Sequence, residues 1–154
     1  MAGDTDATMS AEIRFVRALH YFLLMDGWGN IPFTLEPMTK PEQRSRAQMY
    51  EWLEQELIGI EPALSEAKAK KSTDAGYGRV DKAACWLLLS RLYLNSEIYT
   101  GTAQWQKAKE YADKVIKSSY RLNTVGKGGW TAYQMLFMGD NGETDAAYEA
   151  LLPL

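Results

Sequence analysis

Apolar residues recur at steps of three and four in four stretches of the chain, which is the spacing of amphipathic α-helices. The most apolar stretch lies within residues 80–96. Its apolar side chains cover most of the circumference of a helix: Trp86, Leu87, Leu88, Leu89, Leu92, Tyr93 and Leu94. Such a helix must be covered from two sides. The same periodicity predicts helices over residues 10–25, 46–60, 80–96 and 103–118.

The central stretch also has the spacing of the first helix of a tetratricopeptide repeat, with Trp86, Leu89 and Tyr93 around a small residue, Ser90. A serine at this position allows a neighbouring helix to approach closely. Residues 103–118 supply that second helix. We therefore predict two consecutive helical hairpins, an all-α fold with irregular connecting loops, and burial of Ala84, Trp86, Leu89 and Tyr93.

Polar and glycine-rich stretches divide the chain. Residues 1–9 are predicted to be a disordered or cloning-derived leader, and residues 10–154 a single helical domain. Residues 61–77 turn to Ala, Lys, Ser, Asp and Gly and predict a loop. The apolar ending Ala-Leu-Leu-Pro-Leu predicts a segment of a longer protein.

Composition and charge exclude some classes of function. With 154 residues and 46% hydrophobic content the chain can bury one core. A net charge of −3 offers no positive field for nucleic acid. No apolar run approaches the roughly 20 residues that cross a bilayer. The aromatic content of 12% is rich for a helical domain and suggests core packing or sugar stacking.

Three aromatic residues stand beside glycines or turns rather than in a helical stripe, and they are the candidates for carbohydrate stacking: Trp28, Trp130 and Tyr133. Packing is the interpretation that we weigh more heavily for each. Trp28 would pack its turn against the first two helices, and the other two would cover the end of the second hairpin.

We find no catalytic or metal-binding pattern and expect no cofactor. His20 and Cys85 are the only histidine and cysteine, and both fall within apolar helices, which favours packing roles. Glu51, Glu54 and Glu56 are expected on the solvated face of the second helix. No phosphate-binding or dinucleotide motif occurs.

Three stretches, in this order, resemble the SusD/RagB family of outer-membrane lipoproteins of Bacteroidetes. The first is Ala-Glu-x-Arg-Phe-x-Arg-Ala at residues 11–18, followed by Trp-Gly-Asn-Ile-Pro at 28–32, where Asn30 replaces the usual Asp. The second is Gly-Arg-x-x-Lys-Ala-Ala at 78–84 with the helix after it. The third is the helix from residue 105 to the Tyr-x-Leu at 120–122.

The resemblance implies a non-enzymatic nutrient-binding protein that captures glycans at the cell surface. It implies a lipid-anchored outer-membrane protein with a SusC-like TonB-dependent transporter as its partner, of which this chain is the tetratricopeptide-like scaffold. Much of the family's glycan platform comes from parts outside this chain. The alternative is a helical-repeat scaffold for protein–protein interaction that binds no carbohydrate.

Overall fold

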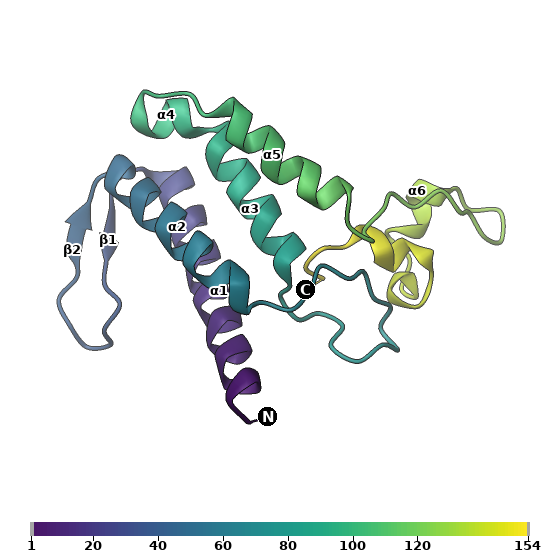
Figure 1. Cartoon of the computed structure of the whole chain (residues 1–154). Helices are drawn as coiled ribbons and strands as arrows, with labels where there is room; N and C mark the ends of the chain where they lie inside the picture. Colours follow the sequence, from purple (N-terminus) through teal and green to yellow (C-terminus); the bar gives the residue numbers. More distant parts are fainter. Residues whose placement is uncertain (1, 154) are drawn as a thin grey trace.

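The computed structural model describes residues 2–153, with the side chains of residues 7–153. It is an all-α structure with irregular connecting loops, as the periodicity predicted (Figure 1). The long helices are α1 (Ala2–Trp28), α2 (Arg46–Ile60), α3 (Lys82–Leu94) and α5 (Trp105–Ile116). The shorter elements are β1 (Ile31–Phe33), β2 (Glu42–Arg44), η1 (Glu61–Ala63), α4 (Ser96–Thr100), α6 (Ala132–Met135), η2 (Asn141–Glu143) and η3 (Asp145–Glu149).

The helices form the two predicted hairpins. α1 packs against α2, and α3 packs against α5. The close approach expected at Ser90 is present, since its Oγ donates to the backbone oxygen of Ala108 in α5 at 2.9 Å. The sheet within residues 2–153 is a two-stranded antiparallel hairpin that pairs Ile31 with Arg44. The sequence predicted an extended stretch there but not its pairing.

One core joins the four long helices. The large side chains buried in it include Phe15 and Phe22 of α1, Leu53 and Leu57 of α2, and the central positions of α3: Ala84, Leu89, Leu92 and Tyr93. The predicted burial of the central helix is therefore confirmed for three of its four named positions. Trp86 is the exception. It is partly exposed, and its Nε1 donates to Glu61 at 2.6 Å.

The charged residues of stretches 11–18 and 78–84 connect the helices through hydrogen bonds. Arg14 of α1 donates twice to Glu56 of α2, at 2.9 and 2.6 Å, and Arg17 donates to the same carboxylate at 2.7 Å. Arg79, just before α3, donates its Nε to Glu12 of α1 at 3.0 Å. These residues therefore have a structural role, and they hold α1 against α2 and against the start of α3.

Two expectations need correction. The acidic residues of α2 are not all solvated: Glu56 is buried beneath the two arginines, and Glu54 accepts from the hydroxyl of Tyr93 at 2.8 Å. α1 also begins at Ala2 rather than near Ser10, because Ser10 continues the helix instead of capping it. The side chains of residues 1–6 lie outside the described part, so the division between leader and domain stays a prediction.

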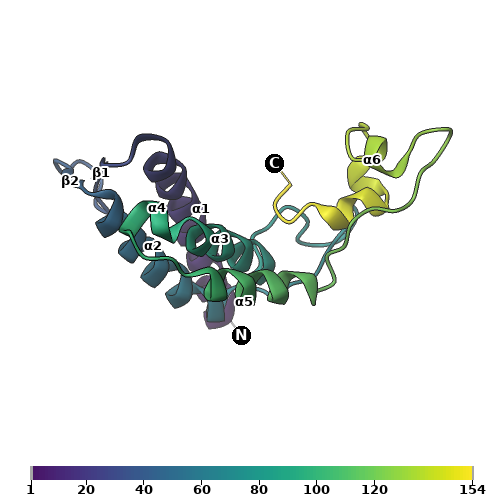
Figure 2. The same cartoon turned by 90° about the horizontal axis from the view of Figure 1, so that it is seen from above.

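The remaining chain forms a separate region, the C-terminal segment, residues 117–153. It leaves the end of α5 and carries α6 and two 3₁₀ turns away from the helical hairpins (Figure 2). Its backbone contacts the loop before α3, where the backbone N of Ser72 donates to the backbone O of Gly142 at 2.7 Å. The segment thus flanks one end of the helical body.

Candidate functional site

The three predicted stacking residues are all exposed. Trp28 ends α1 and is 75% exposed, while Trp130 and Tyr133 are 52% and 70% exposed. Their predicted packing roles are therefore wrong: neither the turn nor the hairpin end is covered by them. Trp28 is followed by Gly29, Asn30 and then β1, and Tyr133 belongs to α6; β1 and α6 lie at opposite sides of the molecule (Figure 1). The structure does not bring Trp28 together with the other two.

Trp130 and Tyr133 lie close in sequence on a locally ordered turn. Gly128 and Gly129 take positive φ values of 61° and 88°, which glycine adopts without a steric cost. Thr131 then caps α6 through a reciprocal pair of hydrogen bonds with Gln134, of 3.3 and 2.9 Å. The cap fixes the direction in which Tyr133 leaves the helix.

Phe137 extends this pair, and sequence reasoning missed it as a candidate. Its ring lies edge-on to that of Tyr133, with centroids 5.2 Å apart, and it is 72% exposed. The i, i+4 spacing of Tyr133 and Phe137 is the signal that could have found it. We call Trp130, Tyr133 and Phe137 the α6 aromatic surface. A hollow of about 310 Å³, lined by Leu136, Tyr77 and Glu149 among others, lies next to it.

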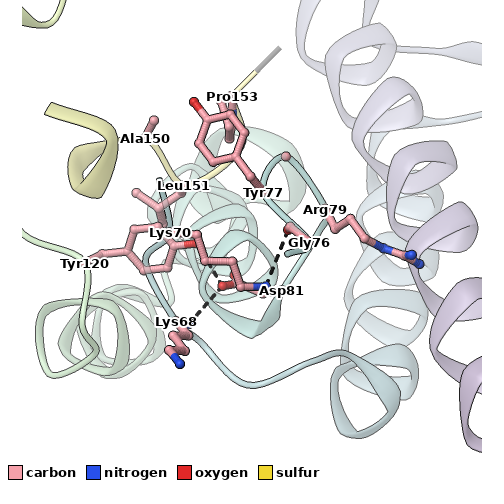
Figure 3. A pocket seen from close by; sticks show the side chains of 11 residues that line it. Lys68, Lys70, Gly76, Tyr77, Arg79, Asp81, Tyr120, Ala150, Leu151 and Pro153 are labelled. Atoms are coloured by element: carbon pink, nitrogen blue, oxygen red, sulfur yellow. Dashed lines mark hydrogen bonds between the residues drawn. The ribbon is translucent and has the colours of Figure 1, made fainter. Parts of the chain in front are cut away.

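A second pocket lies where the C-terminal segment packs against the loop before α3 (Figure 3). Its residues form a joint that connects these two parts of the chain through hydrogen bonds. Asp81 is its centre. This buried carboxylate accepts from the backbone of Ala83, Ala84 and Lys68 and from the hydroxyl of Tyr120, at 2.8 to 3.2 Å. Burial and then the Asp81 carboxylate raise the pKa of Tyr120, so the phenol remains a donor. Its free volume of about 10 Å³ is no larger than a water molecule requires.

The cysteine and the histidine are the residues of this chain most suited to nucleophilic catalysis, and neither lines the pockets described above. Cys85 is fully buried, and burial raises the pKa of its thiol to about 12. The thiol is therefore protonated and unreactive at neutral pH. His20 is exposed on α1, contrary to its predicted packing role, and its Nδ1 lies 2.7 Å from the backbone oxygen of Val16.

Residues 7–153 contain no cluster of three or more His, Cys, Asp or Glu side chains placed to bind a metal ion. No helix within residues 2–153 is both long and apolar enough to span a bilayer.

The face of α1 that points away from α2 is unusually apolar for an exposed surface. Its outward side chains are exposed and spaced by four, three, four and three residues: Met9, Ile13, Val16, His20 and Leu23. The inward stripe of the same helix has the same spacing and is buried: Ala11, Phe15, Ala18, Phe22 and Met25. Apolar stripes on two sides are typical of a helix that packs between two neighbours.

Comparisons with known proteins point to one family. A scan against models of protein families finds no match. Among curated proteins, the starch-binding protein SusD of Bacteroides thetaiotaomicron is 42% identical over 157 aligned positions, which cover 99% of this chain. The chain spans 26% of the length of that protein.

Solved structures show the same fold as this chain. Surface glycan-binding protein A from Bacteroides uniformis superposes with a TM-score of 0.72 at 25% identity, covering 92% of this chain and 30% of that one. A SusD-like carbohydrate-binding protein from Bacteroides fragilis superposes with a TM-score of 0.69 over 86% of this chain and 24% of that one. At 22% identity, this second match supports the fold alone.

Proposed function

The chain belongs to the SusD/RagB family, and from this premise we propose that it is part of a protein that binds carbohydrate. The observation that carries the proposal is the 42% identity, over nearly the whole chain, with a protein named for binding starch. The alignment covers 99% of the chain and therefore includes all four long helices.

The proposal includes the cellular role that this family membership suggests. The full-length protein would be a non-enzymatic component of a nutrient-uptake complex, lipid-anchored at the outer surface of the outer membrane. Its partner would be a SusC-like TonB-dependent transporter. The two helical hairpins of this chain would be the tetratricopeptide-like scaffold of that protein.

The α6 aromatic surface is the best-formed stacking site among the three candidates. Its three rings are exposed, those of Tyr133 and Phe137 are in contact, and the turn before α6 is capped. Aromatic faces stack on the apolar faces of sugar rings. Trp28 is equally exposed but stands alone. We expect weak binding by this chain, with a Kd in the millimolar range (about 4 kcal/mol), because so few rings converge.

Isothermal titration of the 154-residue chain with maltoheptaose, followed by a panel of other neutral oligosaccharides, tests the proposal. We expect millimolar binding that Tyr133→Ala or Trp130→Ala removes. Trp105→Ala is the matched control, since Trp105 is a 62% exposed tryptophan of α5 that belongs to no candidate site. A chain that binds no member of the panel at concentrations well above the expected Kd contradicts carbohydrate binding by the α6 aromatic surface.

The outer face of α1 favours a second candidate function, a protein–protein interaction scaffold that binds a second copy of this chain. Its apolar stripe matches the spacing by which one helix packs on another. Light scattering of the chain as it elutes from a size-exclusion column, at rising protein concentration, tests this function. We expect association that the double variant Ile13→Glu, Leu23→Glu abolishes. A chain that stays monomeric throughout contradicts this function without affecting the carbohydrate proposal.

A further inference from the structure

The outward side of α2 and the adjacent strand β2 enclose a shallow polar hollow of about 370 Å³. We name it the Trp52 hollow, after the indole in its wall. Its walls include Gln43 and Arg44 of β2 and a set of α2 residues at helical spacing: Gln48, Glu51, Trp52 and Gln55. The volume lies within the range of about 300 to 1,000 Å³ typical of small-molecule sites.

Several hydrogen-bonding groups in this hollow are not used by the fold. Within the described part of the chain, the side chains of Gln43, Glu51 and Gln55 and the indole Nε1 of Trp52 make no hydrogen bond to protein. Gln48 uses only its Oε1, which accepts from the backbone of Ser45 at 2.9 Å. Amide, carboxylate and indole groups thus converge on one concave surface, with both donors and acceptors free.

Trp52 forms a fixed wall of the hollow. Its ring lies edge-on to Tyr21 and Phe33, with centroids 5.4 and 4.9 Å apart and interplanar angles of 80° and 64°. The guanidinium of Arg44 lies over Phe33 at 4.0 Å, which holds β2 against this aromatic group. The guanidinium of Arg17 also lies 5.9 Å from the centroid of the Trp52 ring. A partly exposed indole held by Tyr21, Phe33 and Arg17 loses little conformational entropy when a ligand contacts it.

The character of the hollow selects a ligand class. Planar polar side chains beside an aromatic ring suit a molecule with many hydroxyl groups and an apolar ring face. Glu42 and Glu51 carry two negative charges against the one positive charge of Arg44. This excess disfavours an anionic ligand. We propose that the Trp52 hollow binds a neutral saccharide, at a site separate from the α6 aromatic surface. The inference rests on the proposed carbohydrate function and assigns a location to it.

The indole resonances of the ¹⁵N-labelled chain test the inference directly. The chain has five tryptophans, and Trp52→Phe identifies the signal of Trp52 while keeping an aromatic ring between Tyr21 and Phe33. Titration with maltoheptaose should shift the Trp52 indole signal and the backbone amides of β2 and the outer side of α2. A polygalacturonate oligomer of similar length should shift them much less.

Two exposed residues of the hollow can be removed without touching the core. Gln43→Ala and Gln55→Ala should each weaken maltoheptaose binding at the Trp52 signal by about fivefold, the value of one hydrogen bond. Gln106→Ala, an exposed glutamine of α5, is the control and should leave the affinity unchanged.

The outcomes separate the two proposals. Shifts at α6 with none at Trp52 overturn the hollow and leave the carbohydrate function standing. Equal shifts with the anionic oligomer overturn the assigned ligand class. The absence of any shift with any neutral glycan overturns both the hollow and the α6 aromatic surface as carbohydrate sites of this chain.

Discussion

The helical body (residues 7–116) and the C-terminal segment use aromatic residues in opposite ways. In the body, Phe15, Phe22 and Tyr93 are almost completely buried. In the C-terminal segment the rings of the α6 aromatic surface are exposed, and the residues buried there are small or flexible: Met135, Ala146 and Ala147. The cause is element length. Long helices bury a continuous stripe, whereas α6 has four residues and cannot. The rings that face the core from long helices are therefore structural, whereas the rings of the α6 aromatic surface are available for contacts.

The largest effect that this comparison predicts is a matched pair of phenylalanine substitutions. Phe22→Ala should lower the free energy of unfolding by about 3–5 kcal/mol, because it empties a large site in the core. Phe137→Ala should change it by less than about 0.5 kcal/mol, because that ring is already in water. Urea denaturation followed by circular dichroism measures both. Similar losses for the two variants would show that the C-terminal segment is packed as tightly as the body.

The next largest effect concerns the ionic contacts of the body. Glu56→Gln should destabilise the chain by about 2 kcal/mol, since it leaves Arg14 and Arg17 without their carboxylate. This is less than the about 3–5 kcal/mol for fully buried pairs, because the arginines are 42% and 35% exposed.

The same contact predicts a pH dependence. The hydrogen bond from Arg14 holds the pKa of Glu56 below its ordinary value of 4.5; burial opposes this shift and Arg17 adds to it. A folded pKa below the unfolded one stabilises the protein above about pH 4.5, and this stabilisation is lost as the pH falls further. Stability measured from pH 7 to 3 should fall more steeply for the parent chain than for Glu56→Gln. Glu66→Gln is the control, because Glu66 is 83% exposed. Parallel curves for parent and Glu56→Gln would contradict the assignment.

A smaller effect should appear at the joint between the two regions. Asp81→Ala removes the cap of α3 and the acceptor of Tyr120, and should cost about 1–2 kcal/mol. Tyr120→Phe removes only the link to the C-terminal segment and should cost less. Hydrogen exchange separates the two contributions: the amides of Ala83 and Ala84 should lose protection in Asp81→Ala and keep it in Tyr120→Phe. Equal loss in both variants would mean that the cap depends on the segment.

Much of the helical body could be predicted because its helices are long enough to show their period. α2 begins and ends within a residue of the prediction, since Ser45 caps it with a reciprocal bond from Gln48. Periodicity did not predict the burial of aromatic residues at the edge of an apolar stripe correctly. Trp52, Trp86 and Trp105 each fit an apolar spacing and are partly or largely exposed, because the edge of a stripe faces solvent when no further helix covers it.

The candidate sites were less predictable because they depend on tertiary contacts. The sequence places Trp28 beside Gly29 and Trp130 beside Gly129, but it cannot say that no helix covers either ring. The Trp52 hollow requires β2 to lie beside α2. The β1–β2 hairpin places it there by pairing residues 31–33 with residues 42–44, and no regular period in the sequence marks this pairing. The roles of Glu12 and Glu56 likewise follow from partners 67 and 42 residues away.

The smallest predicted effect lies at the hairpin end of the body, where the chain departs from the family's usual aspartate. The Oδ1 of Asn30 accepts from the backbone N of Arg46, the first residue of α2, at 3.1 Å. Asn30→Asp keeps this acceptor and adds a negative charge at the N-terminus of a helix, which stabilises by about 0.3–1 kcal/mol at low ionic strength. Asn30→Ala, which removes the acceptor, should destabilise instead. Thermal unfolding at low and at high salt distinguishes the charge from the hydrogen bond, because salt screens only the former. A gain in Asn30→Asp that persists in high salt would mean that the stabilisation does not come from the helix dipole, and a loss would mean that the asparagine amide itself makes the better contact.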